Sequence, residues 1–245
     1  MIKDFPHSVL ITGASGEIGG AIATALAASG CHLWLCGRTR GDDLTDFCRK
    51  LSEQYEVLCR PLLADITDPK ACDRIFREIR SLDVVVNCAG IAHFSLLQDT
   101  AEEDWTRVIG TNLTGSFHIL KRALPLLLAS SDPRILNISS VWGSRSSPTE
   151  TAYSAAKGGL DALTRSLAGE LAPNGIPVNA IACGVIDTAM NRDHFTEEEL
   201  EALRAGIPMG RFGTPEEVAD LAVALLSAPR YLTGQIIALD GGWKI

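Results

Sequence analysis

The sequence predicts an α/β protein built on a doubly wound, Rossmann-type parallel sheet of seven strands with helices on both faces. Three observations predict this class: short β-rich runs alternate with helical patterns, a glycine-rich turn follows the first run, and polar residues recur where later runs end. In a sheet of this kind, ligands bind beyond the carboxyl ends of the strands, where the strand order reverses.

The β-rich runs have the length of strands, and the stretches between them have apolar residues at helical spacing. We expect strands over residues 7–12, 31–36, 57–63, 83–87, 134–140, 177–182 and 235–239. We expect helices over residues 17–29, 42–54, 68–80, 101–129 in two pieces, 151–172 and 215–227. Asp65, Asn87 and Ser140 come at strand ends, so these side chains should lie near one edge of the sheet.

Length and composition predict one domain over residues 1–245, because the 245 residues are 46% hydrophobic and no linker divides them. The stretch near 188–210 follows the sixth predicted strand, and we expect it to be a substrate loop. The start lacks an apolar signal segment and no apolar stretch is long enough to span a bilayer, so we expect a soluble, cytoplasmic protein without a membrane partner. A net charge of −8 argues against nucleic acid. Seven scattered cysteines without a C-x-x-C pair predict reduced thiols and no metal site.

The glycine-rich turn reads TGASGEIG at residues 12–19 and leads into the first predicted helix. Glycines let the backbone approach a pyrophosphate, and a helix N-terminus offers it N–H groups, so we expect a dinucleotide here. At the end of the second strand, Gly37 is not acidic, whereas Arg38 and Arg40 could bind a 2′-phosphate. NADP(H) is therefore the favoured cofactor, with NAD(H) as the alternative.

Tyr153 and Lys157 lie four residues apart in a predicted helix, so a phenol and an ammonium share one face. A cation beside a phenol stabilises phenolate and should lower the pKa of Tyr153 from about 10. Tyr153 could then exchange a proton with a ketone or alcohol oxygen. With Ser140 at a strand end upstream, these residues favour a carbonyl reductase.

Further motifs follow along the chain: NCAG at 87–90, GTNL at 110–113, ISSV at 138–141, YSAAK at 153–157, PVNAIACG at 177–184 and TGQIIALDGG at 233–242. In this order they resemble the motifs of the short-chain dehydrogenase/reductase family over essentially the whole chain. The resemblance implies hydride transfer from NADPH to a ketone and a catalytic tetrad of Asn112, Ser140, Tyr153 and Lys157. In this tetrad Asn112 would hold a proton-relaying water, and Lys157 would bind the nicotinamide ribose.

The resemblance also implies which residues contact the cofactor. Asp65 would contact the adenine, and Thr188 the nicotinamide amide. The implied set is Gly13, Ser15, Gly16, Ile18, Gly19, Arg38, Asp65, Ile66, Asn87, Ala89, Gly90, Tyr153, Lys157, Gly184, Ile186 and Thr188.

Three residues depart from the family pattern. Glu17 replaces the middle glycine of the turn, Cys88 replaces an Asn, and Cys183 replaces a Pro. A carboxylate beside a pyrophosphate would repel it unless the side chain turns out to solvent, so Glu17 is expected to weaken cofactor binding. The two cysteines are expected to be structural adjustments.

Within the family the chain resembles bacterial 3-oxoacyl-acyl-carrier-protein reductases. Through SSVWG at 139–143, FTEEEL at 195–200 and GGW at 241–243, it is similar to the elongation factor P 5-aminopentanone reductases. An acidic acyl carrier would need basic residues beside the cleft, and the loops at 129–132 and 172–175 have none. Arg145 and Arg192 could compensate, and elongation factor P is itself expected to be acidic, so the lack of basic residues in these loops only weakens the case for the acyl-carrier substrate. The resemblance implies an aminopentanone-type ketone on elongation factor P. The alternatives are the acyl-carrier substrate, a free small ketone, sugar or hydroxysteroid, and a non-catalytic NADP(H)-binding protein.

The substrate pocket and the assembly are also predicted. Phe94, Trp142, Met190 and Phe195 could line an apolar pocket. The helices near 112–129 and 151–172 carry apolar residues at helical spacing, namely Leu120, Ala123, Leu124, Leu127, Ala156, Leu160, Leu163 and Leu167. The resemblance implies that these helices form a dimer interface within a homotetramer, with Trp243 near a subunit boundary. A monomer whose helices pack inward is the alternative.

Overall fold

A parallel seven-stranded sheet forms the centre of the protein. The computed structural model describes residues 8–38, 41–145, 147–192 and 194–243. The strands are β1 (Ser8–Thr12), β2 (His32–Gly37), β3 (Cys59–Leu63), β4 (Val84–Asn87), β5 (Arg134–Ser140), β6 (Val178–Cys183) and β7 (Ile236–Leu239). Their order in the sheet is β3-β2-β1-β4-β5-β6-β7, so it reverses between β1 and β4. This confirms the predicted doubly wound fold.

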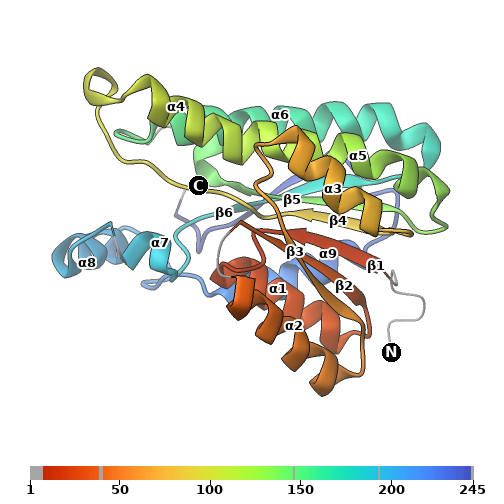
Figure 1. Cartoon of the computed structure of the whole chain (residues 1–245). Helices are drawn as coiled ribbons and strands as arrows, with labels where there is room; N and C mark the ends of the chain where they lie inside the picture. The colour runs from red at the N-terminus through yellow and green to blue at the C-terminus, as the bar shows by residue number, and fades with distance from the viewer. Residues whose placement is uncertain (1–7, 39–40, 146, 193, 244–245) are drawn as a thin grey trace.

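Helices cover both faces of the sheet (Figure 1). One layer contains α3 (Pro69–Glu78), α4 (Glu102–Ile109), α5 (Gly115–Ala129) and α6 (Thr151–Leu171), and the other contains α1 (Glu17–Ala28), α2 (Gly41–Tyr55) and α9 (Pro215–Leu226). Successive strand side chains point to opposite faces, so Ile11 joins the core under α1 while Leu10 joins the core under α5. Within the described residues, no helix is both long and apolar enough to cross a bilayer.

The predicted elements are present, and their ends agree with the prediction to within two residues. His7, where the first strand was predicted to begin, lies outside the described residues. The expected loop over 188–210 is wrong, because this stretch contains α7 (Ala189–Arg192) and α8 (Glu197–Ala205). Thr196 and Glu199 form a capping box that starts α8. The two short helices lie beyond one end of the sheet (Figure 1).

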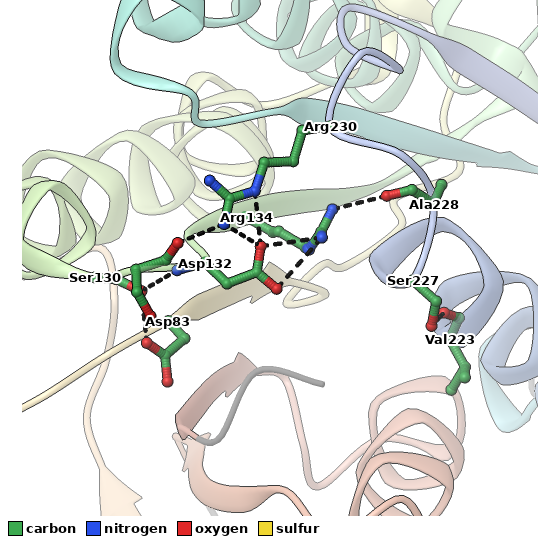
Figure 2. A network of polar contacts seen from close by, with 9 residues as sticks. Asp83, Ser130, Asp132, Arg134, Val223, Ser227, Ala228 and Arg230 are labelled. Carbon is green, nitrogen blue, oxygen red and sulfur yellow. Dashed lines mark hydrogen bonds and ion pairs between the residues drawn. The ribbon is translucent and has the colours of Figure 1, made fainter. Parts of the chain in front are cut away.

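A polar network ties the strands and helices together at the amino ends of the central strands (Figure 2). Asp132, before β5, accepts hydrogen bonds from Arg134 at 3.0 Å and from Arg230 at 2.9 Å. Arg134 also donates to the carbonyl of Ala228 after α9 at 3.0 Å. Ser130, after α5, donates to Asp83 before β4 at 2.5 Å. These contacts fix the edge of the sheet opposite to the one where a ligand is expected.

The apolar stripes on α5 and α6 face mainly inward. Leu120, Ala123, Leu127, Ala156 and Leu160 are buried, and Leu124, Leu163 and Leu167 are partly buried against the same core. The exposed large apolar side chains of this helical layer are Trp105, Phe117 and Leu128, which the sequence analysis did not single out. The stripe that suggested a subunit interface therefore belongs largely to the core of one chain.

Candidate active site

A cavity of about 890 Å³ opens at the carboxyl ends of the strands. Its wall includes the glycine turn after β1, the loops after β2, β3 and β4, the ends of β5 and β6, and residues of α7. This is the position where a doubly wound sheet binds its ligands. Ser140, Tyr153 and Lys157 all line the cavity.

The hydroxyls of Ser140 and Tyr153 meet in this cavity. Ser140 is the last residue of β5, and its Oγ accepts a hydrogen bond from the backbone N–H of Trp142 at 3.2 Å. Tyr153 lies in the first turn of α6, near enough to Ser140 for that side chain to lower the pKa of the phenol. Both hydroxyls can therefore reach one carbonyl oxygen.

The pKa of Tyr153 shifts in the direction opposite to the one expected from the sequence. Burial raises it well above the ordinary value for a phenol, and the negative charge of Glu150 raises it further, whereas the hydrogen bond with Ser140 lowers it. Nζ of Lys157 lies 5.5 Å from the centroid of the Tyr153 ring and donates to the carbonyl of Ile138 at 2.8 Å. Burial lowers the pKa of Lys157 itself. Tyr153 therefore keeps its proton at neutral pH.

Asn112 is hydrogen-bonded to the backbone of two separate segments. It lies in a π-helical turn over Gly110–Thr114 that separates α4 from α5. Its Nδ2 donates to the carbonyls of Ile91 at 2.9 Å and Val108 at 3.0 Å, and its Oδ1 accepts from the N–H of Ile91 at 3.1 Å. Asn112 does not line the cavity, and both of its side-chain N–H groups are used. Only its side-chain oxygen could still accept a hydrogen bond from the water that the family resemblance implies.

The glycine turn forms a cradle of main-chain atoms. Gly13 has φ +68°, and a Cβ there would lie 2.7 Å from the backbone nitrogen of Ala89. A Cβ at Gly19 would lie 2.3 Å from the carbonyl oxygen of Gly13. Side chains are therefore excluded at both positions, and the turn packs directly on the loop after β4. Such a turn before a helix fits a pyrophosphate.

Glu17 does not simply point to solvent. Its Oε2 accepts a hydrogen bond from the backbone N–H of Ala189, at the start of α7, at 2.6 Å. Its Oε1 pairs with the guanidinium of Arg192, which also contacts Asp187 at 2.6 Å. The carboxylate that replaces glycine thus joins the cofactor turn to α7.

Arg38 and Asp65 face each other in the part of the cavity wall that follows β2 and β3, where Nη1 of Arg38 lies 3.8 Å from Oδ2 of Asp65. Partial burial acts to raise the pKa of Asp65, but its hydrogen bonds with Thr67 and the charge of Arg38 outweigh this and hold the pKa below its usual range. More than half of the Arg38 side chain is exposed. Arg40, the other predicted phosphate ligand, lies outside the described residues.

The remaining cofactor residues implied by the resemblance line the cavity, with the exception of Asn87. Asn87 is buried and donates to Oδ1 of Asn137 at 2.9 Å, so it positions the end of β4. Cys88 and Cys183, expected only as structural adjustments, also line the cavity. Burial raises the pKa of each thiol to about 12, so both stay protonated at neutral pH. All seven cysteines are free thiols.

Aromatic side chains form another part of the wall. Phe94, Trp142, Met190 and Phe195 line the cavity as predicted, and Trp243 joins them. The rings of Trp142 and Trp243 make an edge contact with centroids 5.0 Å apart, and those of Phe94 and Phe195 a similar contact at 5.2 Å. Trp243, expected near a subunit boundary, thus packs at the active-site cavity of its own chain.

The family model described as enoyl-(acyl carrier protein) reductase matches residues 13–244. The chain belongs to the short-chain dehydrogenase/reductase family. The uncharacterized oxidoreductase YmfI of Bacillus subtilis is 36% identical to this family member over 238 residues, which are 96% of this chain and 98% of that protein. The 3-oxoacyl-[acyl-carrier-protein] reductase FabG of Thermotoga maritima is 37% identical over 241 residues, covering 96% and 97% of the two chains.

Solved structures of this dehydrogenase/reductase family superpose on nearly the whole chain. The 3-oxoacyl-[acyl-carrier protein] reductase of Brucella melitensis gives a TM-score of 0.91 at 33% identity, covering 98% of this chain and 91% of that one. A variant of actinorhodin polyketide ketoreductase with NADPH gives 0.90 at 32% identity and covers 97% of each chain. The protein is therefore an oxidoreductase of this family.

One acidic residue in the cavity of this short-chain dehydrogenase/reductase was missed by the sequence analysis. Glu150 occupies the N-cap position of α6, but its side chain makes no capping hydrogen bond. Its Oε2 instead accepts from the hydroxyl of Ser147 at 2.5 Å, and it lines the cavity with only 8% of its surface exposed. Burial raises the pKa of this carboxyl. Its place three residues before Tyr153, about one helical turn away, is the signal that could have revealed it.

Proposed function

We propose that this protein reduces a ketone to a secondary alcohol with NADPH and that Tyr153 donates the proton. One observation carries the proposal: Ser140 and Tyr153 line one cavity with the glycine turn and Lys157, and Ser140 is near enough to Tyr153 to lower the pKa of the phenol. Two hydroxyls so placed can stabilise the negative charge that develops on a carbonyl oxygen.

The residues of the cavity fit NADP(H). The main-chain cradle at Gly13 and Gly19 suits the pyrophosphate, Arg38 is exposed where a 2′-phosphate would lie, and Thr188 lines the wall for the nicotinamide amide. Two structures of similar fold, described with NADPH and with bound NADP, support this choice. NADPH, when bound, supplies the hydride for the carbonyl carbon.

Side chains of this protein supply the proton and position the ketone. The raised pKa of Tyr153 keeps the phenol loaded with a proton, which suits reduction of a ketone better than oxidation of an alcohol. Ser140 orients the carbonyl oxygen by a second hydrogen bond. Lys157, held by Ile138, would contact the nicotinamide ribose. The side-chain oxygen of Asn112 and Nζ of Lys157 converge on Gly90, which gives a path for replacing the proton that Tyr153 donates.

The substrate that we propose is an amino-ketone, an aminopentanone group carried on elongation factor P. Two features support it: the substrate part of the cavity contains the carboxylate of Glu150 beside aromatic rings, and Arg192, a basic residue of α7 that an acyl carrier could have used, is paired with Glu17 and Asp187. Arg145, the other basic residue that could compensate, is exposed and could still meet an acidic acyl carrier.

Reduction of a 3-oxoacyl group on acyl carrier protein is the second candidate. It is favoured by relatives of that name, such as the Thermotoga maritima protein, which match over nearly their whole length. The apolar and aromatic wall could also accept an acyl chain. A free ketone, sugar or steroid is supported by no particular contact in the cavity.

We propose that the protein assembles into a homotetramer. Trp105 on α4 and Phe117 and Leu128 on α5 expose between 40% and 50% of their surface on the outer side of the helical layer. Burial of apolar groups of this size against a second copy would be favourable. Light scattering at micromolar concentration tests this proposal, and a monomeric mass would refute it.

A substrate panel tests the proposed reaction. NADPH consumption should be followed with an acetoacetyl thioester, a ketosteroid, a keto-sugar and elongation factor P that carries the aminopentanone group, and repeated with NADH. We expect turnover of the modified elongation factor and a preference for NADPH. Faster reduction of the thioester would favour the second candidate, and no turnover of any ketone would refute the reductase.

A further inference from the structure

We propose that Glu150 binds a positively charged amine of the substrate, so that this cavity selects ketones with an ammonium group several bonds from the carbonyl. The inference rests on the proposed ketone reductase function and identifies the residue that recognises the charge. Four observations support it, and each concerns a different property of the site.

The first observation is the backbone that aims Glu150 into the cavity. Thr149, just before it, has φ 68°, a left-handed conformation that a β-branched residue adopts rarely. The strained segment is held in place because the N–H of Ser95, in the loop after β4, donates to the carbonyl of Thr149 at 2.8 Å. Strain that the surroundings maintain is typical of functional sites. Glu150, the next residue, occupies the N-cap position of α6 without a capping hydrogen bond and lines the cavity.

The second observation is the lack of a paired cation. Glu150 is held by neutral donors, the hydroxyl of Ser147 and the side chain of Trp142. No lysine or arginine among the described residues forms an ion pair with it. His194, which follows α7, acts to lower the pKa of Glu150 by its charge, but it is exposed and its ring pairs with the carbonyl of Met190. A buried carboxylate without a cation is costly, so an ammonium ligand would satisfy it.

The third observation is the aromatic lining of the cavity that contains Glu150. Trp142 acts to lower the pKa of Glu150 and packs edge-on against Trp243, while Phe94 contacts both His194 and Phe195. Aromatic faces attract ammonium groups, and most strongly so when water is excluded. A carboxylate flanked by such rings suits an alkylammonium better than an acyl chain, whose apolar end would have to lie against Glu150.

The fourth observation links this residue to the reaction. The charge of Glu150 is close enough to Tyr153 to raise the pKa of the phenol. An ammonium bound to Glu150 would offset that charge while the carbonyl lies at Tyr153 and Ser140. The same substrate would thus be held at both of its ends, and a ketone without the ammonium would be held at only one.

A pair of matched ketones tests the proposal. In 5-(dimethylamino)pentan-2-one a tertiary amine, protonated at neutral pH, cannot close onto the ketone as an imine, and 6-methylheptan-2-one has the same shape without the charge. The wild type should reduce the amino-ketone with the higher kcat/KM. Glu150→Gln changes the charge beside Tyr153 for both ketones alike, so the readout is the ratio of the two kcat/KM values, which should fall by about 10-fold or more in disfavour of the amino-ketone, the effect of one charge-assisted contact.

Glu197→Gln is the matched control, because it removes the same charge from the exposed surface of α8 outside the cavity. It should leave the ratio between the two ketones unchanged. Equal losses for both ketones in Glu150→Gln, or no preference for the amino-ketone in the wild type, would overturn the proposal.

A binding measurement separates this inference from the reductase itself. Pentyldimethylamine has no carbonyl, so its calorimetric binding to the protein does not depend on turnover. We expect binding to the wild type and at least a 10-fold weaker affinity in Glu150→Gln. If neither ketone is reduced but this difference is seen, the reductase is wrong and the cation site stands. Equal affinity in both proteins would refute the cation site, whether or not ketones are reduced.

Discussion

The carboxylate of Glu17, in the glycine turn, accepts a hydrogen bond from the backbone N–H of Ala189 at 2.6 Å across 172 residues of sequence. The same carboxylate pairs with Arg192. A residue that should weaken cofactor binding by its charge therefore also anchors α7, which lines the same cavity. Glu17 thus has two opposed effects: its charge should weaken cofactor binding, and its contacts hold α7 in place.

Glu17→Gly should separate the two effects. Removing the carboxylate ends its repulsion of the pyrophosphate, so the KM for NADPH should fall, while the lost anchor of α7 should raise the KM for the ketone several-fold. Steady-state kinetics with each substrate varied in turn measures both. Glu17→Gln can still accept the hydrogen bond from Ala189, so it should lower the KM for NADPH with a smaller effect on the ketone. Unchanged constants in both variants would show that the contact has no role.

Tyr153→Phe should abolish turnover without disturbing the cofactor. Only the proton donor is removed, so kcat should fall by about 10²–10⁴-fold. NADPH binding, followed by its fluorescence, should persist because the ring still packs beside Lys157. A variant that retains most of its activity would show that another group donates the proton.

Arg38→Ala tests the choice of dinucleotide. A charge-assisted contact with the 2′-phosphate contributes about 1.5–3 kcal/mol, so the KM for NADPH should rise by about 10-fold or more and that for NADH should hardly change. Asp65 loses its cationic neighbour in this variant. Asp65→Asn is therefore the control for that loss, and it should not remove the preference for NADPH. Equal effects of Arg38→Ala on the two cofactors would contradict the assignment.

Glu150→Gln should also change how stability depends on pH. The pKa of Glu150 in the folded protein is raised by burial above the ordinary glutamate value of about 4.3, so the ionised carboxylate destabilises the fold. The contribution of Glu150 to the free energy of unfolding is most favourable below the ordinary pKa. It is lost as the pH rises through the pKa that Glu150 has in the folded protein. Without a ligand, the variant should be at least as stable as the wild type near pH 8, as measured by thermal unfolding. A clearly lower melting temperature near pH 8 would mean that the negative charge stabilises the fold.

Most of the fold could be predicted from the sequence because its signals are local. Strand periodicity, helix spacing and the turn at Gly13 each depend on neighbouring residues, and the predicted elements match β1–β7 and the main helices. The helices in 188–210 were missed because they are short, although the capping pair Thr196 and Glu199 is visible in the sequence. The inward-facing residues of α5 were taken as a possible interface because helical spacing alone does not say which face meets the sheet.

In the candidate site, too, the sequence predicted what depends on local patterns and missed what depends on contacts between distant residues. Ser140, Tyr153 and Lys157 were predicted to converge, and they line one cavity, since their motif spacing and strand positions place them there. The direction of the pKa shift of Tyr153 was not predictable, because it depends on burial and on Glu150. The contact between Glu17 and α7 joins distant parts of the chain, and no local pattern reveals it.

Isotope transfer tests the central claim most directly. The protein should be incubated with NADPH that carries deuterium at both C4 positions and with 5-(dimethylamino)pentan-2-one, and the product examined by mass spectrometry. The account predicts a secondary alcohol with one deuterium on the carbinol carbon, formed by the wild type and not by Tyr153→Phe. An alcohol without deuterium, or no alcohol from any ketone in the substrate panel, would contradict it.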